Sequence, residues 1–83
     1  MRVAVRYFAS LREALGSGES VDVAVGSSVR SLRDQLIARG GRFAEVLARG
    51  RAVRCALDQT MCDESAALRD GAEVAFFPPV TGG

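Results

Sequence analysis

Histidine and lysine are absent from this 83-residue sequence, and all 11 of its basic residues are arginines. Without histidine, the chain lacks the usual general base near neutral pH and the commonest metal ligand. Without lysine, it has no amine for a Schiff base and no side chain that can accept an isopeptide bond. We therefore expect no metal site and no side-chain active site belonging to this chain.

Long apolar runs and an excess of one charge are also missing. No run approaches the roughly 20 apolar residues of a membrane span, and residues 1–6 are not followed by the apolar stretch of a signal peptide. The net charge is +1, so nucleic acid is not an expected partner. We expect a cytoplasmic protein with no membrane or nucleic-acid contact. One arginine-rich stretch is read either as a solvated face or as a site for an acidic partner (Arg39, Arg42, Arg49, Arg51, Arg54).

Only two cysteines are present, Cys55 and Cys62, and their spacing matches neither a C-x-x-C motif nor a zinc site. In the cytoplasm the default is a pair of reduced thiols. A cysteine that carries a persulfide is the alternative.

Alternation of apolar and polar side chains predicts strands at residues 2–8, 20–25, 52–57 and 72–77, with a brief strand at 61–62. One predicted sheet face is apolar and covers the core (Val3, Val5, Tyr7, Val21, Val23, Val53, Leu57, Val74, Phe76). The other predicted face is charged (Arg2, Arg6, Asp22, Arg54, Glu73). By the same alternation Phe8 and Phe77 end their strands on the solvent side. If the first and last strands are neighbours, these two aromatic residues form a patch typical of a protein interface.

Helical spacing predicts one main helix of about 12 residues. It has an N-cap at Ser27 or Ser28 and ends before Gly40-Gly41, with one apolar stripe (Val29, Leu32, Leu36, Ile37). A short helix is expected from Ser10 to Leu15, with Ser10 and Glu13 as a capping box. A second short helix is expected to carry Phe43, Val46 and Leu47. One main helix packed on one face of a mixed sheet of four to five strands is an α+β architecture.

The last six residues have no periodic pattern. Pro78 and Pro79 lack the N–H groups needed for further strand pairing, and the sequence ends in Gly82-Gly83. We expect a domain at residues 1–77 and an extended, flexible tail at residues 78–83 that reaches roughly 20 Å.

A glycine pair suits a carboxylate that must enter a closed enzyme site, because no side chain obstructs the backbone. Joining the Gly83 carboxylate to AMP makes a mixed anhydride that a sulfur nucleophile attacks. The product is a thiocarboxylate, itself a good sulfur nucleophile. Chemistry of this kind needs no acid or base from the body of the chain.

The stretch from Leu68 to Gly83, LRDGAEVAFFPPVTGG, resembles the C-terminal signature of the small subunit of molybdopterin synthase. The segment from Phe8 to Glu13 also resembles the start of that family. The resemblance covers the whole chain and is weakest near residues 40–51. Asp58 stands where relatives often have Asn.

The resemblance implies a ubiquitin-like β-grasp fold and a sulfur-carrier role. Gly83 would be adenylated by an ATP-dependent activating enzyme, converted to a thiocarboxylate, and used to donate sulfur to cyclic pyranopterin monophosphate in molybdenum cofactor biosynthesis. ATP is then used by the activating enzyme, and the chain itself binds no cofactor. The partner would be the large subunit, in a heterotetramer. The implied contact residues are Phe8, Met61, Phe77, Pro78, Pro79, Val80 and Thr81, with Gly82 beside the reacting Gly83.

Two alternatives remain at this stage. One is a carrier for another pathway, such as thiamine synthesis or tRNA thiolation, and the other is a modifier conjugated to target lysines. The Gly-Gly ending alone does not separate them.

Overall fold

A computed structural model describes residues 1–79. Within them, three helices and five strands follow one another along the chain. The strands are β1 (Arg2–Tyr7), β2 (Gly18–Asp22), β3 (Arg54–Leu57), β4 (Thr60–Cys62) and β5 (Glu73–Phe77). The helices are α1 (Ala9–Leu15), α2 (Val29–Ile37) and α3 (Gly41–Leu47). None of the helices in the described part is long and apolar enough to cross a membrane.

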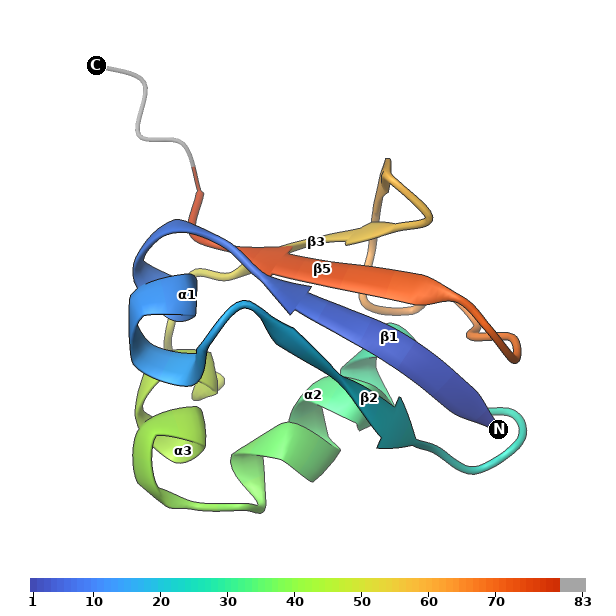
Figure 1. Cartoon of the computed structure of the whole chain (residues 1–83), viewed down its shortest axis with the longest axis horizontal. Coiled ribbons are helices and arrows are strands. Elements are labelled where there is room, and N and C mark those ends of the chain that lie inside the picture. The colour runs from blue at the N-terminus through green and yellow to red at the C-terminus, as the bar shows by residue number, and fades with distance from the viewer. Residues whose placement is uncertain (80–83) are drawn as a thin grey trace.

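The five strands form one mixed sheet in the order β2-β1-β5-β3-β4. The central pair, β1 and β5, is parallel, and the other three pairings are antiparallel. The helices lie on one side of this sheet, and β5 is the last element of the described chain (Figure 1). The predicted α+β class, with a five-stranded sheet on a main helix, is confirmed.

The core lies between the sheet and α2. Most residues predicted to face inward are buried, and Val53 and Leu57 are partly buried against the same cluster. Side chains such as Val5, Leu32 and Phe76 are fully buried, and burial of each stabilises the fold by about 1.5–3 kcal/mol.

The main helix begins as predicted. Ser28 is the N-cap of α2, and its hydroxyl accepts a hydrogen bond from the Ser31 backbone N–H at 3.2 Å. The helix ends at Ile37, and Gly40 has a positive φ of 75° that few other residues adopt. The predicted stop at Gly40-Gly41 is therefore confirmed, and the same pair opens α3.

The predicted capping box at Ser10 and Glu13 is wrong. The N-cap of α1 is Phe8, which has extended backbone geometry and no side-chain cap. Its N–H continues the sheet ladder by donating to the Phe76 carbonyl at 3.1 Å. The chain then enters the helix through Ala9, whose φ of 52° makes the sharp change of direction. Long-range strand pairing thus outweighs the local capping preference.

The second strand is displaced from the predicted range of residues 20–25. It starts at Gly18, which pairs with Arg6, and it ends at Asp22. Val23 is still buried, whereas Val25 is 88% exposed. A Cβ atom on Gly18 would lie 2.4 Å from the Val5 carbonyl oxygen, so glycine here permits close approach of two strands.

Candidate functional site

The sheet face opposite the helices carries an apolar patch, which we call the outer patch. It consists of side chains from β3, β4, β5 and the end of β1 (Phe8, Ala56, Met61, Ala75, Phe77). Successive residues of a strand point to opposite faces, so these residues alternate with core residues such as Cys55 and Phe76. The patch therefore lies on the sheet face that does not pack against the core.

Strand register places the patch residues side by side. Ala75 of β5 lies opposite Ala56 of β3, which lies opposite Met61 of β4. One row of small and apolar side chains therefore crosses three strands. Phe77 of β5 belongs to the next row toward the C-terminus, where its β3 partner is Arg54.

Phe8 completes the patch on the other side of β5. Strands β1 and β5 are parallel neighbours, as the predicted aromatic patch requires. The guanidinium of Arg6, the preceding outward residue of β1, lies 5.9 Å from the centroid of the Phe8 ring. Both side chains therefore project from the same face.

Three of the predicted contact residues, Phe8, Met61 and Phe77, differ in exposure. Met61 is 53% exposed and Phe8 is 41% exposed, whereas Phe77 is half-buried. Phe77 lies on the central strand, between Arg54 and the end of β1, which accounts for its lower exposure. Apolar side chains left this accessible at the centre of a charged rim are typical of a protein-binding surface.

The rim of the patch is polar. Arg6 forms an ion pair with Glu73 at 3.7 Å, and Arg54 is exposed beside Phe77. Ion pairs this exposed contribute little to stability, roughly 0–1 kcal/mol. Charges at the rim of an interface mainly affect the association rate and the register of binding.

The predicted tail begins where the outer patch ends. Strand β5 stops at Phe77, and Pro78 and Pro79 are half-buried. Pro78 lines a cavity of about 210 Å³ together with Leu11 of α1 and Val46 of α3. Pro78, the first residue after β5, therefore lies near α1 and α3. The remaining predicted site residues, Val80, Thr81, Gly82 and Gly83, lie outside the described residues.

Ala56 and Ala75 were missed as patch residues by the sequence interpretation. Alternation does place Ala75 on the same face as Phe77 and Ala56 on the same face as Arg54. Their small size gave no signal, because a small side chain matters only through the flat surface that it leaves between larger neighbours.

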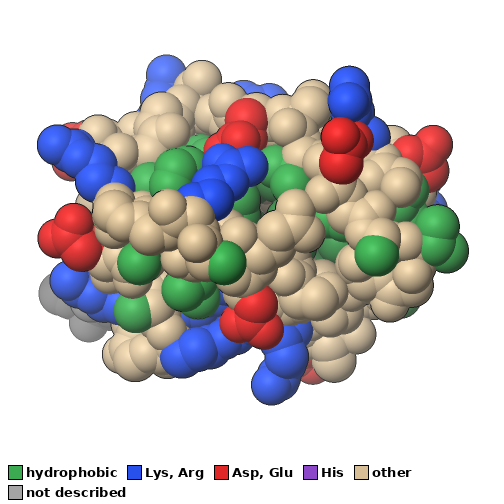
Figure 2. Space-filling model, turned by 90° about the horizontal axis from the view of Figure 1, so that it is seen from below, with side chains coloured by type: hydrophobic (Ala, Val, Ile, Leu, Met, Phe, Trp, Pro, Cys, Tyr) green, Lys and Arg blue, Asp and Glu red, His purple; other side chains and the backbone are tan. Residues whose placement is uncertain are grey.

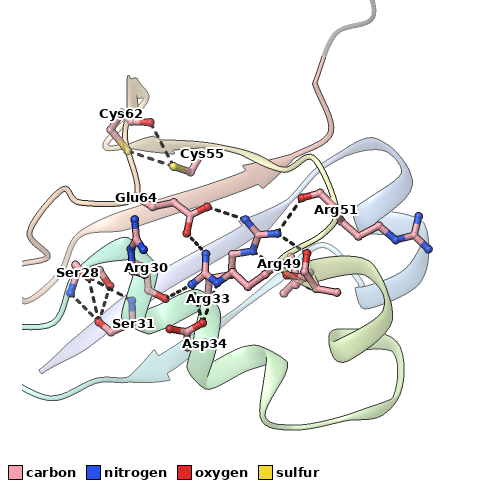
Figure 3. A network of polar contacts seen from close by, with 12 residues as sticks. Ser28, Arg30, Ser31, Arg33, Asp34, Arg49, Arg51, Cys55, Cys62 and Glu64 are labelled. Carbon is pink, nitrogen blue, oxygen red and sulfur yellow. Dashed lines mark hydrogen bonds and ion pairs between the residues drawn. The ribbon is translucent and has the colours of Figure 1, made fainter.

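A buried arginine was also missed. Arg33 is only 3% exposed, and its guanidinium donates to the carbonyls of Leu47 at 2.8 Å and Ala48 at 2.7 Å. It also forms an ion pair with Glu64 at 2.6 Å (Figure 3). Arg33 falls at i+4 from Val29, on the apolar stripe of α2, and this position was the available signal.

Two residues of the arginine-rich stretch form ion pairs with acidic residues of the same chain. Arg39 pairs with Glu19 at 2.8 Å, and Arg49 pairs with both Asp34 and Glu64. Basic and acidic side chains are interspersed on the face seen in Figure 2, from the helix side of the molecule. The interpretation as a solvated face, laced with ion pairs, accounts for these contacts.

The chain is similar to known proteins over nearly its full length. The model of the ThiS family matches residues 5–83. The molybdopterin synthase sulfur carrier subunit of Escherichia coli strain K12 is 40% identical over 81 residues, which cover 98% of this chain and 99% of that protein.

Solved structures share the whole fold. The crystal structure of SAMP1 from Haloferax volcanii has a TM-score of 0.80 at 26% identity, with full coverage of both chains. A complex of subunits 1 and 2 of the molybdopterin-converting factor from Helicobacter pylori contains a chain that superposes with a TM-score of 0.70 at 25% identity, again with full coverage of both. With its β-grasp sheet and a family match over nearly its full length, this chain belongs to the ThiS family of ubiquitin-like proteins.

Proposed function

We propose that this chain is the sulfur-carrying subunit of a molybdopterin synthase. The observation that carries the proposal is the 40% identity to the E. coli sulfur carrier subunit over 98% of the chain. The continuous outer patch beside the base of the tail supports it, because such a carrier needs a docking surface next to its reactive end.

In this proposal Gly83 is the reacting residue. Its carboxylate attacks the α-phosphate of ATP on an activating enzyme, which gives an acyl adenylate and releases pyrophosphate. A sulfur nucleophile then displaces AMP, leaving a thiocarboxylate on Gly83. The thiocarboxylate donates its sulfur to cyclic pyranopterin monophosphate within the large subunit. The chain acts as a sulfurtransferase only through its C-terminus.

The large subunit is the proposed docking partner, and the outer patch is the proposed contact surface. Phe8 and Met61 would insert into apolar pockets, whereas Ala56 and Ala75 would allow close approach of the partner backbone. Pro78, Pro79, Val80 and Thr81 would follow the partner surface into its active site, and Gly82 would pass the narrowest point. The H. pylori complex of subunits 1 and 2 supports a two-subunit arrangement of this kind.

The decisive experiment follows sulfur on the intact chain. After incubation with ATP, the activating enzyme and a sulfide source, mass spectrometry should detect replacement of one oxygen by sulfur on the C-terminal residue. Deletion of Gly83 should abolish both this mass change and molybdopterin formation with the large subunit, while the circular dichroism spectrum is unchanged. As a matched control, Gly50→Ala should retain both, because no atom lies within 4 Å of a Cβ at that position.

Continued molybdopterin formation by the Gly83-deleted chain would refute the proposal. Sulfur found on a cysteine instead would favour a persulfide carrier. The second candidate, a protein modifier, is favoured by the likeness to SAMP1, a small archaeal modifier protein. It predicts covalent attachment of Gly83 to lysines of other proteins, which tryptic mapping of conjugates would detect.

A further inference from the structure

Two thiols lie directly opposite each other at the edge of the sheet. Cys55 of β3 pairs in register with Cys62 of β4, and their Sγ atoms are 3.6 Å apart (Figure 3). The Cys55 thiol also donates to the Cys62 carbonyl oxygen at 3.3 Å. Both side chains belong to the core face, so the sulfur atoms face each other beneath the sheet and away from the outer patch.

The backbone at this position suits a covalent link. Residues directly opposite each other in antiparallel strands have Cα atoms about 4.5–5.5 Å apart. A disulfide needs a Cα separation of about 4.4–6.8 Å. The two ranges overlap, so rotation of the side chains brings the sulfur atoms into bonding distance without moving the strands.

A path to the sulfur atoms is also present. A cavity of about 240 Å³ is lined by both cysteines and by neighbouring residues of β3 and the segment after β4 (Val53, Arg54, Asp63, Glu64). Cys62 is partly exposed, whereas Cys55 is only 4% exposed. A small reagent in the cavity therefore meets Cys62 first.

We propose that Cys55 and Cys62 form a thiol–disulfide pair that low-molecular-weight disulfides oxidise. The Cys62 thiolate attacks a disulfide RSSR, forms a mixed disulfide and releases one RSH. Cys55 then attacks the Cys62 sulfur, displaces the second RSH and closes the Cys55–Cys62 bond. The two cysteines lose two hydrogens and two electrons, and these reduce RSSR to two RSH.

The environments of the thiols set this order of reaction. Burial, followed by the hydrogen bond and proximity of Cys62, raises the pKa of Cys55 to about 12. Cys55 is therefore a poor nucleophile toward reagents in solution. Once Cys62 carries a leaving group, the attack by Cys55 is intramolecular and starts from a sulfur already in contact.

A Cys55–Cys62 disulfide would connect β4, the shortest strand of the sheet, covalently to β3. Strand β4 has three residues, lies at the sheet edge and pairs only with β3 within the described residues. It also carries Met61, an outer-patch residue, immediately before Cys62. Oxidation should therefore slow local opening of the strand that holds Met61 in place.

The test uses the full chain, reduced and then exposed to bis(2-hydroxyethyl) disulfide, an uncharged reagent that the charges around the cavity do not repel. Trypsin cleaves after Arg54 and Arg69, so one peptide, residues 55–69, contains both cysteines. This peptide should become lighter by two hydrogen masses and retain no hydroxyethylthio group. In the oxidised chain, hydrogen exchange of the Thr60 amide, which pairs with Leu57 across the hairpin, should slow severalfold.

Two variants separate the steps. Cys55→Ala should stop at the mixed disulfide, with one hydroxyethylthio group on Cys62, and Cys62→Ala should leave the buried Cys55 unmodified. The proposal is overturned if the wild-type peptide keeps its reduced mass, retains hydroxyethylthio groups, or is found only in a disulfide-linked dimer. If Cys55→Ala does not fold, the mass of the wild-type peptide alone decides whether the disulfide forms. Unchanged exchange at Thr60 would overturn the effect on β4 and thus on the outer patch.

Discussion

Replacing Arg33 with methionine should strongly destabilise the fold, because this guanidinium joins three segments. The Arg33 side chain projects from α2, and its guanidinium donates hydrogen bonds to the carbonyls of Leu47 and Ala48 at the C-terminal end of α3. It also donates to the Arg51 carbonyl at 3.1 Å and to the Glu64 carboxylate at 2.6 Å. Positive charge at the C-terminal end of a helix also complements its dipole.

The size of the effect follows from what is left behind. Methionine fills most of the same volume, so the loss of packing is small. The carbonyls of Leu47 and Ala48 lose their charged donor in a poorly hydrated place, and Glu64 keeps only Arg49 as an ion-pair partner. Removing one member of a buried ion pair typically costs 3–5 kcal/mol. Because Glu64 stays paired, we expect the lower end, about 3 kcal/mol, which corresponds to a fall in Tm of roughly 12–24 °C for a domain of this size.

Urea unfolding followed by circular dichroism measures this free energy. The matched control is Arg30→Met, the same chemical change at an exposed position of the same helix, which should stay within about 0.5 kcal/mol of wild type. If Arg33→Met cost no more than this control, the network would not stabilise the fold. A loss of unfolding free energy equal to that of Arg30→Met, with an unchanged m-value, would therefore contradict a stabilising role of the Arg33 network.

Three further outcomes follow from the structure. Phe77→Ala should weaken large-subunit binding roughly 30-fold, as measured by calorimetry, with little loss of stability. The control Val25→Ala, at an 88% exposed position outside the patch, should bind normally. A large loss of stability in Phe77→Ala would instead make Phe77 a core residue. Gly18→Ala should destabilise the protein by about 1–3 kcal/mol, because its Cβ would lie 2.4 Å from a β1 carbonyl oxygen, while Gly50→Ala should be nearly neutral in the same urea assay. Burial raises the pKa of Glu64, but hydrogen bonds from two arginines outweigh it and hold the pKa below its ordinary value of 4.5. Stability from this group is therefore present above pH 4.5 and lost as pH falls below it, and Glu64→Gln should flatten that part of an acid-unfolding curve; an unchanged curve would contradict the assignment.

The inward-facing residues were predictable because their periodicity is local. Strand alternation identified Val5 and Phe76 as core residues, and helical spacing identified Leu32, all of which are fully buried. The N-cap at Ser28 was equally local, since a serine before an apolar helical stripe is a strong signal.

The strand order was not predictable from such patterns. Placing β5 between β1 and β3 brings together residues about 70 positions apart, such as Val5 and Val74. Alternation says which way each side chain faces but not which strand is its neighbour. The same limit explains the error at α1, where the pairing of Phe8 with Phe76 decides how the helix begins. Family resemblance, and not periodicity, supplied the fold name.

The candidate site was predictable only in part for the same reason. The solvent-facing direction of Phe8 followed from alternation, but its proximity to Phe77 depends on the parallel pairing of β1 and β5. Cys55 and Cys62 looked unrelated at seven residues apart. They meet because Asp58 and Gln59, with φ of 48° and 68°, make a two-residue hairpin that places the cysteines in register.

The position of β5 supports the proposed link between docking and sulfur transfer. This strand lies between β1 and β3, so its end at Phe77 is held from both sides, and Pro78 packs near α1 and α3. Gly83 is the sixth residue after Phe77, a reach of at most roughly 20 Å. Under the proposed function, a partner bound to the outer patch would have Gly83 within that distance of Phe77, and the chain would present its C-terminus without supplying a catalytic side chain.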